Sequence, residues 1–373
     1  MRFPGFEDEW EVKKLGEVSE IKTGNKDTQN KVDGGKYPFF VRSNTVERIN
    51  SYSYDGEAIL TSGDGVGVGK NFHYIEGKFD FHQRVYALRN FKIGYYGKFL
   101  YSVFSEKFYN RVKSLSAKNS VDSVRMDMIS SMKIHFPNFI EQKKIASFLS
   151  LIDERIQTQN KIIKELDVLK NIFSQRIFSQ ELKFQDNNGA DFPAWETKKL
   201  KDVCDINPKI KSVPNSFYYI DLESVVNGRL LKEDRILKDE APSRAQRVLA
   251  KNDVLFQMVR PYQKNNLFFD KEGEYVASTG YAQIRSRQSS QFIYQYLHNQ
   301  RFVDKVIERC TGTSYPAISS TDLGNIEIDY LTLAEQIKIA DFLSKIDTKV
   351  HLENQILELL NKQKKYLLAN LLI

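Results

Sequence analysis

Cysteine and histidine are scarce in this 373-residue chain, which limits the chemistry that its side chains can support. The two cysteines, Cys204 and Cys310, lie far apart and form neither a CxxC pair nor a disulfide framework, so we expect a reducing compartment. The five histidines have no metal-ligand spacing. The sequence therefore predicts no metal site.

Long hydrophobic runs are also missing. No window approaches about 18 uninterrupted apolar residues, and the opening "MRFPGFEDEWEVKKL" has no apolar core of signal-peptide length. We therefore expect a cytoplasmic protein that contacts no membrane. With 41% apolar and 28% charged residues, the chain is typical of a globular protein with two or three domains, and its net charge of +7 would attract a polyanion without proving one.

Nucleotide-binding motifs are lacking, although "TSGDGVGVGKNF" (residues 61–72) resembles a phosphate-binding loop. A Walker loop requires a glycine where Asp64 stands and a Ser or Thr where Asn71 stands, and G-x-G-x-x-G fits no position here. Its flanks are rich in β-branched and aromatic residues, which predicts strands on both sides. We interpret the segment as a glycine-rich β-turn that either needs positive φ or lets bare backbone approach a ligand.

A nuclease pattern remains as an alternative. Asp64, Glu76 and Lys78 imitate the D…E-x-K arrangement, in which two carboxylates and a lysine bind magnesium and activate water. The pattern has no counterpart in the second half of the chain.

The chain contains an internal repeat. "WEVKKLGEVSEI" (residues 10–21) recurs as "WETKKLKDVCDI" (195–206), and "EQKKIASFLSLID" (141–153) recurs as "EQIKIADFLSKID" (335–347) with ten of thirteen positions identical. The segments between them show no obvious similarity. The organisation is therefore a duplicated framework around two different middle segments.

The second shared segment predicts a long helix in each half. Apolar residues alternate spacings of four and three along each copy, with Gln159 and Glu353 at equivalent polar positions. Each helix could run about 40 residues, or roughly 60 Å. The seam positions are Ile145, Leu149, Ile152, Ile156, Ile163 and Leu166, then Ile339, Leu343, Ile346, Val350, Leu357 and Leu360.

These features predict an α+β protein with a pseudo-twofold repeat, in which two long antiparallel coiled-coil helices separate two globular α/β domains. A plain core helix in a bundle is the alternative for each helix. The expected boundaries are 1–138 and 185–332 for the globular domains, and 139–184 and 333–373 for the helical spacers. A rod holding two different domains suits the recognition of two separated, dissimilar DNA sequences.

Over essentially its full length, the chain resembles the specificity subunit of type I restriction-modification systems. The resemblance is carried by the Phe-Pro…Trp-Glu…Lys-Leu-Gly-Glu-Val opening (residues 3–18), its second copy (192–203), and the Glu-Gln-x-x-Ile-Ala-x-x-Leu-x-x-Ile-Asp helices at Glu141 and Glu335. A proline normally precedes the Glu-Gln pair; Pro137 does so in the first copy, but "YLTLAEQ" lacks it.

The resemblance implies that the globular domains are target recognition domains, each reading half of a split double-stranded DNA sequence. It also implies no catalytic residue in this chain, docking of two methyltransferase subunits on the helices, and restriction or translocase subunits joined through them. S-adenosylmethionine, ATP and magnesium would belong to those partners.

Candidate DNA contacts are guanidinium, amide, amine and hydroxyl side chains near turn residues. Arg pairs with guanine and Asn or Gln with adenine, while Lys and Ser hold phosphates. In the first variable segment they are Arg42, Asn44, Lys70, Asn71, Gln83, Arg84, Lys118, Asn119 and Arg125. In the second they are Arg244, Arg247, Arg260, Tyr262, Gln263, Lys264, Thr279, Tyr281, Thr313, Ser314 and Tyr315.

A further alternative is a coiled-coil scaffold that links two protein-binding domains. It explains the repeat, and it predicts no salt-dependent DNA binding.

Overall fold

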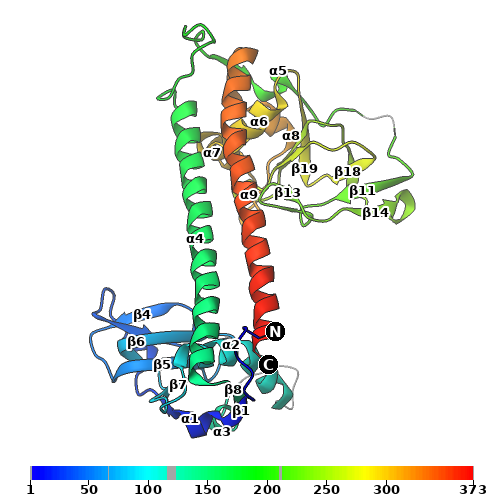
Figure 1. The fold of residues 1–373 in the computed structure, drawn as a ribbon. Coiled ribbons are helices and arrows are strands. Elements are labelled where there is room, and N and C mark those ends of the chain that lie inside the picture. The colour runs from blue at the N-terminus through cyan, green and yellow to red at the C-terminus, as the bar shows by residue number, and fades with distance from the viewer. Residues whose placement is uncertain (1, 66, 116–122, 210–211, 373) are drawn as a thin grey trace. The chain divides into compact units, whose positions relative to one another are not determined.

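The computed structural model describes residues 2–65, 67–115, 123–209 and 212–372, which form two compact units (Figure 1). The first unit comprises Met1–Asn160 and Gln355–Ile373, and the second comprises Lys161–Asn354. The division falls inside two long helices, α4 (Phe139–Phe178) and α9 (Leu333–Leu371), so each unit contains a segment of both. Their lengths of 40 and 39 residues agree with the length that the apolar spacing predicts.

The first unit is built on a six-stranded sheet of strand order β2-β7-β5-β6-β3-β4, in which β3 and β6 form the parallel pair. Strands β5 and β6 are antiparallel on either side of the glycine loop, which confirms the predicted flanking strands. Helix α2 covers the sheet with buried aromatic rings, including the stacked Phe104 and Phe108. Its elements before α4 are β1 (Glu11–Lys14), α1 (Leu15–Val18), β2 (Glu20–Thr23), η1 (Thr28–Asn30), β3 (Tyr37–Phe40), β4 (Val46–Ile49), β5 (Tyr54–Ser62), β6 (Phe72–Phe81), β7 (Val85–Arg89), α2 (Gly97–Leu115), α3 (Met126–Ser130) and β8 (Lys133–Phe136).

The second unit contains two four-stranded sheets, of order β10-β19-β16-β17 and β14-β11-β18-β15, instead of one six-stranded sheet. Helices α6 and α7 bury Phe292, Tyr296 and Phe302 against the first of these sheets. Its elements between the long helices are β9 (Glu196–Lys199), α5 (Leu200–Val203), β10 (Cys204–Ile206), β11 (Ser216–Ile220), β12 (Val225–Val226), β13 (Arg229–Leu230), β14 (Asp234–Leu237), η2 (Lys238–Glu240), β15 (Ala245–Val248), β16 (Asp253–Gln257), η3 (Pro261–Gln263), β17 (Leu267–Phe269), β18 (Tyr275–Ser278), β19 (Tyr281–Ser286), α6 (Ser290–Leu297), α7 (Gln300–Ile307), α8 (Ser320–Gly324) and β20 (Glu327–Tyr330).

The repeated sequence segments form the same local structure in both units. Strand β1 pairs antiparallel with β8 in the first unit, and β9 pairs antiparallel with β20 in the second. The amide of Leu15 donates to Met132 O over 2.9 Å, and that of Leu200 donates to Ile326 O over the same distance. The framework is thus conserved within the chain while the sheets between its parts differ.

Both long helices begin with the same glutamine contact. The Gln142 side chain donates to Pro137 O over 2.8 Å, and Gln336 donates to Leu331 O over 2.9 Å. The side chain of Asn138 accepts from the Glu141 amide at the start of α4, and Thr332 takes that role for Glu335 at α9. Helix α9 therefore begins at the equivalent position without the preceding proline.

Segments of α4 and α9 pack together within each unit. In the first unit, Ile145, Leu149 and Ile152 share a core with Leu367 and Leu371. In the second unit, Lys170 pairs with Asp347 and the Phe173 ring contacts the Phe342 ring, at centroids 5.1 Å apart. In these contacts a higher residue number on α4 meets a lower residue number on α9, so the two segments are antiparallel.

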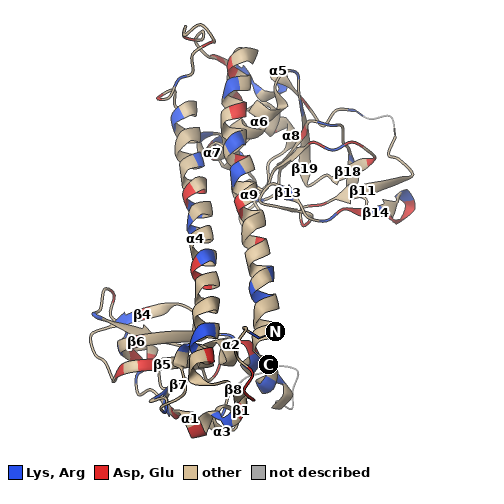
Figure 2. Ribbon diagram, viewed as in Figure 1, with Lys and Arg blue, Asp and Glu red and all other residues tan. Residues whose placement is uncertain are grey.

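Charges of both signs lie along both long helices (Figure 2), as expected for helix faces exposed to water. Within the described ranges, no helix is both long and apolar enough to cross a membrane.

Candidate nucleic-acid interface

Four turns of the first unit lie side by side and carry most of its predicted contact residues. The Gly63 amide donates to Arg84 O over 2.7 Å, and the Val124 amide donates to Gly63 O over 2.7 Å. The Arg42 guanidinium donates to Asp64 Oδ1 over 3.0 Å. These contacts join the segments 41–44, 62–65, 67–71, 82–84 and 123–125 into one surface, called here the first turn surface.

Asp64 fixes two arginines of the first turn surface. Its carboxylate lies 3.0 Å from Arg42 Nη1 and 3.7 Å from Arg84 Nε, while the Arg84 side chain stays 67% exposed. A carboxylate shared by two cations limits their motion but leaves most guanidinium donors open to a ligand. This surface can therefore present oriented cations to phosphates or base edges.

Two buried polar residues support these arginines from below. The Asn71 side-chain amide donates to Arg42 O and to Ser62 Oγ, both over 3.3 Å. The Arg84 amide donates to His82 Nδ1 over 2.9 Å. Burial, together with the charge of Arg42, lowers the pKa of His82, so the imidazole is neutral near pH 7 and keeps a lone pair for that bond.

The glycine loop has a structural explanation. Gly65 has φ of 81°, in the left-handed region, and a Cβ on Gly67 would lie 1.9 Å from Asn71 Nδ2. The loop folds compactly over the Asn71 amide, since the amides of Lys70 and Asn71 both donate to Gly67 O. Positive φ and close packing account for these two glycines, as the turn interpretation predicts.

The other predicted residues of the first unit are placed as follows. Arg125 is exposed directly after Val124, and Gln83 is exposed and donates to Asp27. Lys70 and Asn44 line a polar hollow of about 310 Å³, in which the Lys70 amine lies 5.6 Å from the centre of the Tyr109 ring. Lys118 and Asn119 lie outside the described residues.

The second unit also joins four turns, in a different sheet context. The Thr279 amide donates to Arg244 O over 2.8 Å, and the Met258 amide donates to Gly280 O over 3.0 Å. The Arg260 amide donates to Pro316 O over 2.7 Å. The segments 243–247, 257–264, 278–280 and 311–317 therefore form a second turn surface.

Exposed predicted residues cluster on the second turn surface. Tyr315 is 65% exposed and Tyr262 is 50% exposed, and the Arg260 guanidinium lies 4.1 Å from the centre of the Tyr315 ring. Arg247 is part-buried, and burial lowers its pKa. Also exposed are Arg244, Gln263, Thr313 and Ser314, while Thr279 and Lys264 are intermediate.

Two predicted contact residues are buried in this structure. Tyr281 is fully buried at the start of β19 and packs in a hydrophobic cluster, so it cannot touch DNA from this position. Asn71 is 7% exposed and uses its amide to hold Arg42 and Ser62. Both residues support the surface instead of forming it.

Sequence reasoning missed the supporting residues. The sequence predicts a role for Asp64 only as a metal ligand and none for Gln257, although the Gln257 amide donates to Asn266 Oδ1 beneath the second turn surface. A polar residue directly after the apolar run Val254–Phe256 is the available signal, and Gln257 is the last residue of β16.

The nuclease alternative finds no support in the geometry. The Asp64 carboxylate is shared by two arginines, and Lys78 lies 4.0 Å from Asp55. Across the residues that the structure describes, no three potential ligand side chains gather as a metal site.

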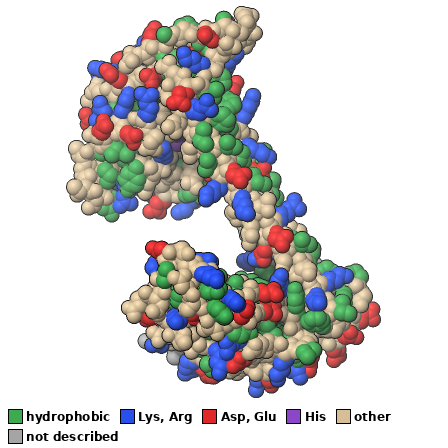
Figure 3. Space-filling view, turned by 90° about the vertical axis from the view of Figure 1, so that its left-hand side faces the viewer, with side chains coloured by type: hydrophobic (Ala, Val, Ile, Leu, Met, Phe, Trp, Pro, Cys, Tyr) green, Lys and Arg blue, Asp and Glu red, His purple; other side chains and the backbone are tan. Residues whose placement is uncertain are grey.

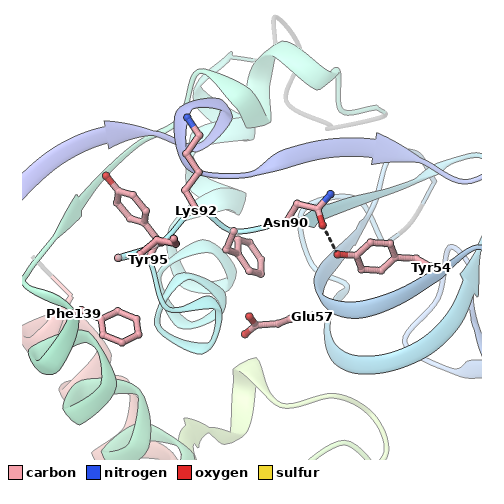
Figure 4. Close-up of a pocket in the computed structure, with 9 residues that line it drawn as sticks. Tyr54, Glu57, Asn90, Lys92, Tyr95 and Phe139 are labelled. Carbon is pink, nitrogen blue, oxygen red and sulfur yellow. Dashed lines mark hydrogen bonds between the residues drawn. The ribbon is translucent and has the colours of Figure 1, made fainter.

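A larger hollow of the first unit, of about 560 Å³, differs in character from the turn surfaces (Figure 4). Tyr54, Glu57, Asn90, Tyr95 and Phe139 line it, and the Tyr54 hydroxyl donates to Asn90 over 2.7 Å. Its lining includes a single basic residue, Lys92. A site of this composition does not suit a polyanion.

Charge alone does not locate an interface. In the view of Figure 3, basic side chains are spread among acidic and apolar ones. The candidate interface is therefore identified by the joined turns and by the comparisons with known proteins.

The family model for the type I restriction modification DNA specificity domain matches the chain twice, at residues 7–168 and 194–362. The chain belongs to this specificity family. Each match covers one copy of the framework and the sheet structure between its parts, so the two turn surfaces lie in two copies of one domain type.

Named members of the specificity family match most of the chain. The chain is 24% identical to the type I restriction enzyme EcoDI specificity subunit of Escherichia coli, over 89% of this chain and 80% of that protein. It is 25% identical to the MjaVIII specificity subunit of Methanocaldococcus jannaschii, over 70% and 66% of the two chains.

Solved structures agree with this fold. The S subunit of a type I restriction-modification system from M. genitalium superposes with a TM-score of 0.67 at 17% identity, covering 100% of this chain and 97% of that one. A chain from a study of complex assembly and conformational transition of the type I R-M system gives 0.56 at 17% identity, covering 99% and 98%.

Proposed function

We propose that this chain is the DNA sequence-specificity subunit of a type I restriction-modification complex and reads a bipartite target, with one unit for each half-site. The observation that carries the proposal is one framework repeated around two different turn surfaces, each presenting arginines on segments that backbone hydrogen bonds join. Equal frameworks with unequal surfaces suit two dissimilar half-sites.

The chain acts in this proposal without catalysing a reaction. Two methyltransferase subunits dock on it, and restriction or translocase subunits join through them. S-adenosylmethionine, ATP and magnesium are bound by those partners. The absence of a nucleotide-binding motif from the sequence supports this division of labour.

The decisive experiment is a base-resolution map of methylated adenine in the host genome, with this gene intact and deleted. Loss of one split motif on deletion is expected, and its two halves would be the two half-sites. An unchanged map in cells that express the complex would refute the proposal.

Salt dependence tests the two surfaces separately. Each phosphate contact changes the slope of log affinity against log salt by about 0.9. We expect the double change Arg84→Ala, Arg125→Ala to reduce the slope by about 2, and Arg244→Ala, Arg247→Ala to do the same. The two effects should add, because the residues belong to separate units.

The matched control for the salt experiment is Arg235→Ala. Arg235 lies on β14, outside the second turn surface, and is paired with Glu274. Removal of the Arg235 side chain should therefore leave the salt slope unchanged. A slope near zero for the unaltered complex would instead favour the coiled-coil scaffold.

A further inference from the structure

The backbone holds Arg260 in an unusual conformation. Arg260 has φ of 53° at the start of η3, and Lys264 has φ of 52° at its end. The left-handed region is unfavourable for a non-glycine residue. Two such residues within one short loop persist only because surrounding contacts fix the loop.

Those contacts come from both sides of the loop. The Arg260 amide donates to Pro316 O, and the Ile318 amide donates to Met258 O over 3.1 Å. Beneath them, the Gln257 side chain donates to Val259 O over 2.7 Å and to Gln263 Oε1 over 2.9 Å. The Arg260 side chain thus starts from a fixed backbone position.

Tyr315 contacts the Arg260 guanidinium and limits its position. The distance of 4.1 Å from the guanidinium carbon to the ring centre is that of a cation–π contact. The ring limits where the guanidinium can lie, while Tyr315 itself stays 65% exposed on the second turn surface. A stacked arginine of this kind is suited to planar, bidentate recognition.

Arg260 also lacks a protein anion. Among the described residues, no carboxylate pairs with its guanidinium, and its buried Nε has no hydrogen-bond acceptor. By contrast, Arg285 makes two hydrogen bonds to Asp253. Because Nε is buried, the donors left for a ligand are those of the two Nη atoms, which no hydrogen bond to a described residue occupies.

We propose that Arg260 is a specificity-determining residue that donates to the O6 and N7 acceptors of a guanine in the half-site bound by the second unit, and that Tyr315 is its positioning residue. Guanine is the base that offers two acceptors in the major groove to an arginine fork. This inference rests on the proposed function.

The test measures methylation of a library with randomised half-sites by the subunit assembled with its methyltransferase partners. Arg260→Ala should reduce the preference for G·C at one position of one half-site by about 5- to 150-fold, as expected for one bidentate contact. Arg260→Lys keeps the charge and should lose most of the same preference. The other half-site should be read as before, and the other positions of the same half-site should keep their preferences, which reports that the second unit is folded in the variants.

Tyr315 provides the matched pair of variants. Tyr315→Phe keeps the ring and should retain the preference, whereas Tyr315→Ala should weaken it at the same base position. Arg235→Ala is the control arginine, since it contacts the Tyr218 ring in a similar way but is paired with Glu274.

Two results would overturn the inference. If Arg260→Ala lowers methylation equally on all sequences and reduces the salt slope by about 1, Arg260 contacts phosphate. If the Arg260→Ala variant keeps the same base preferences at both half-sites, Arg260 has no role in recognition. Failure of the proposed function is distinguishable, because the unaltered complex would then select no split sequence at all.

Discussion

Glu141 and Glu335 occupy equivalent positions at the starts of α4 and α9 but have different partners. Glu141 is fully buried and accepts two hydrogen bonds from Arg2, over 2.9 and 2.8 Å. Glu335 is 4% exposed and accepts one from Trp195 over 3.1 Å, while its Oε2 has no partner within the described ranges. Burial raises the pKa of Glu335.

This difference predicts opposite effects of the same substitution. A raised folded-state pKa means that Glu335 favours folding below its ordinary pKa, near 4.3, and that this contribution is lost as the pH rises through the folded value. At pH 7 to 8, Glu335→Gln should stabilise the second unit by about 1 kcal/mol, a rise of about 2–4 °C in Tm, because it removes a buried charge and keeps the acceptor for Trp195. The gain should shrink towards pH 4.

Glu141→Gln is the matched control and should destabilise the first unit at pH 7, because Arg2 loses its anionic partner. Thermal unfolding followed by fluorescence separates the two effects, since the chain has two tryptophans, Trp10 in the first unit and Trp195 in the second. Stabilisation by Glu335→Gln that is equal at pH 4 and pH 8 would contradict the charge argument.

The candidate site could be predicted from sequence by region but not by side chain. Arg42, Arg84 and Arg260 were predictable, because arginines next to turn residues are commonly exposed, and all three lie on the joined turns. Tyr281 has similar neighbours in "STGYAQ", yet it begins a buried strand whose partners, β16 and β10, are far away in sequence. Local composition cannot reveal which face of such a strand meets the core.

At the scale of elements, the repeat relates two ion pairs. The offset of 194 residues between the helix copies maps Asp153 onto Asp347 and Lys170 onto Lys364. Lys364 pairs with Asp153 in the first unit, and Lys170 pairs with Asp347 in the second. The distance from Nζ to Oδ1 is 2.5 Å in both pairs. Each pair joins α4 to α9 and favours the same antiparallel register.

Double-mutant cycles to alanine should give coupling energies below about 1 kcal/mol for both pairs, since neither pair is fully buried. The Lys170–Asp347 coupling should be the larger. Lys170 is 20% exposed against 34% for Lys364, and Asp347 also accepts from Gln295 over 2.7 Å. When unfolding is measured at low and high salt, the coupling energy of Asp153–Lys364 should fall more than that of Lys170–Asp347. Equal salt sensitivity of the two coupling energies would contradict the ranking.

The long helices were predictable because their signal is local and present twice. The apolar spacing of four and three along "EQKKIASFLSLID" and its copy defines a helix without knowledge of its partner. The sheets were not predictable in detail. The parallel contact of β3 with β6 joins residues about 40 positions apart, and no spacing rule indicates that pairing.

At the scale of the whole molecule, the first unit depends on the last turns of α9. Leu367, Leu371 and Leu372 are buried in the same core as Phe99 and Ile145. Leu371→Ala should therefore destabilise the first unit by about 2–4 kcal/mol through the cavity that it leaves. Its effect should appear in residues more than 200 positions earlier in the chain.

Leu359→Ala is the control on the same helix, because Leu359 is 64% exposed, and its effect should stay within about 0.5 kcal/mol. Hydrogen exchange measures the two units separately. Faster exchange in β5 and β7 with unchanged exchange in β16 and β19 is expected for Leu371→Ala. Faster exchange confined to the second unit would show that the assignment of the helix end to the first unit is wrong.

This arrangement has a consequence for protein synthesis. Residues 1–160 leave the ribosome before the second unit, but the leucines that close their core, Leu367 and Leu371, are made after it. The second unit, residues 161–354, is complete before them. The two units are therefore finished in the reverse of their order along the chain, and the nascent first unit exposes part of its apolar core to chaperones until the end of α9 has been made.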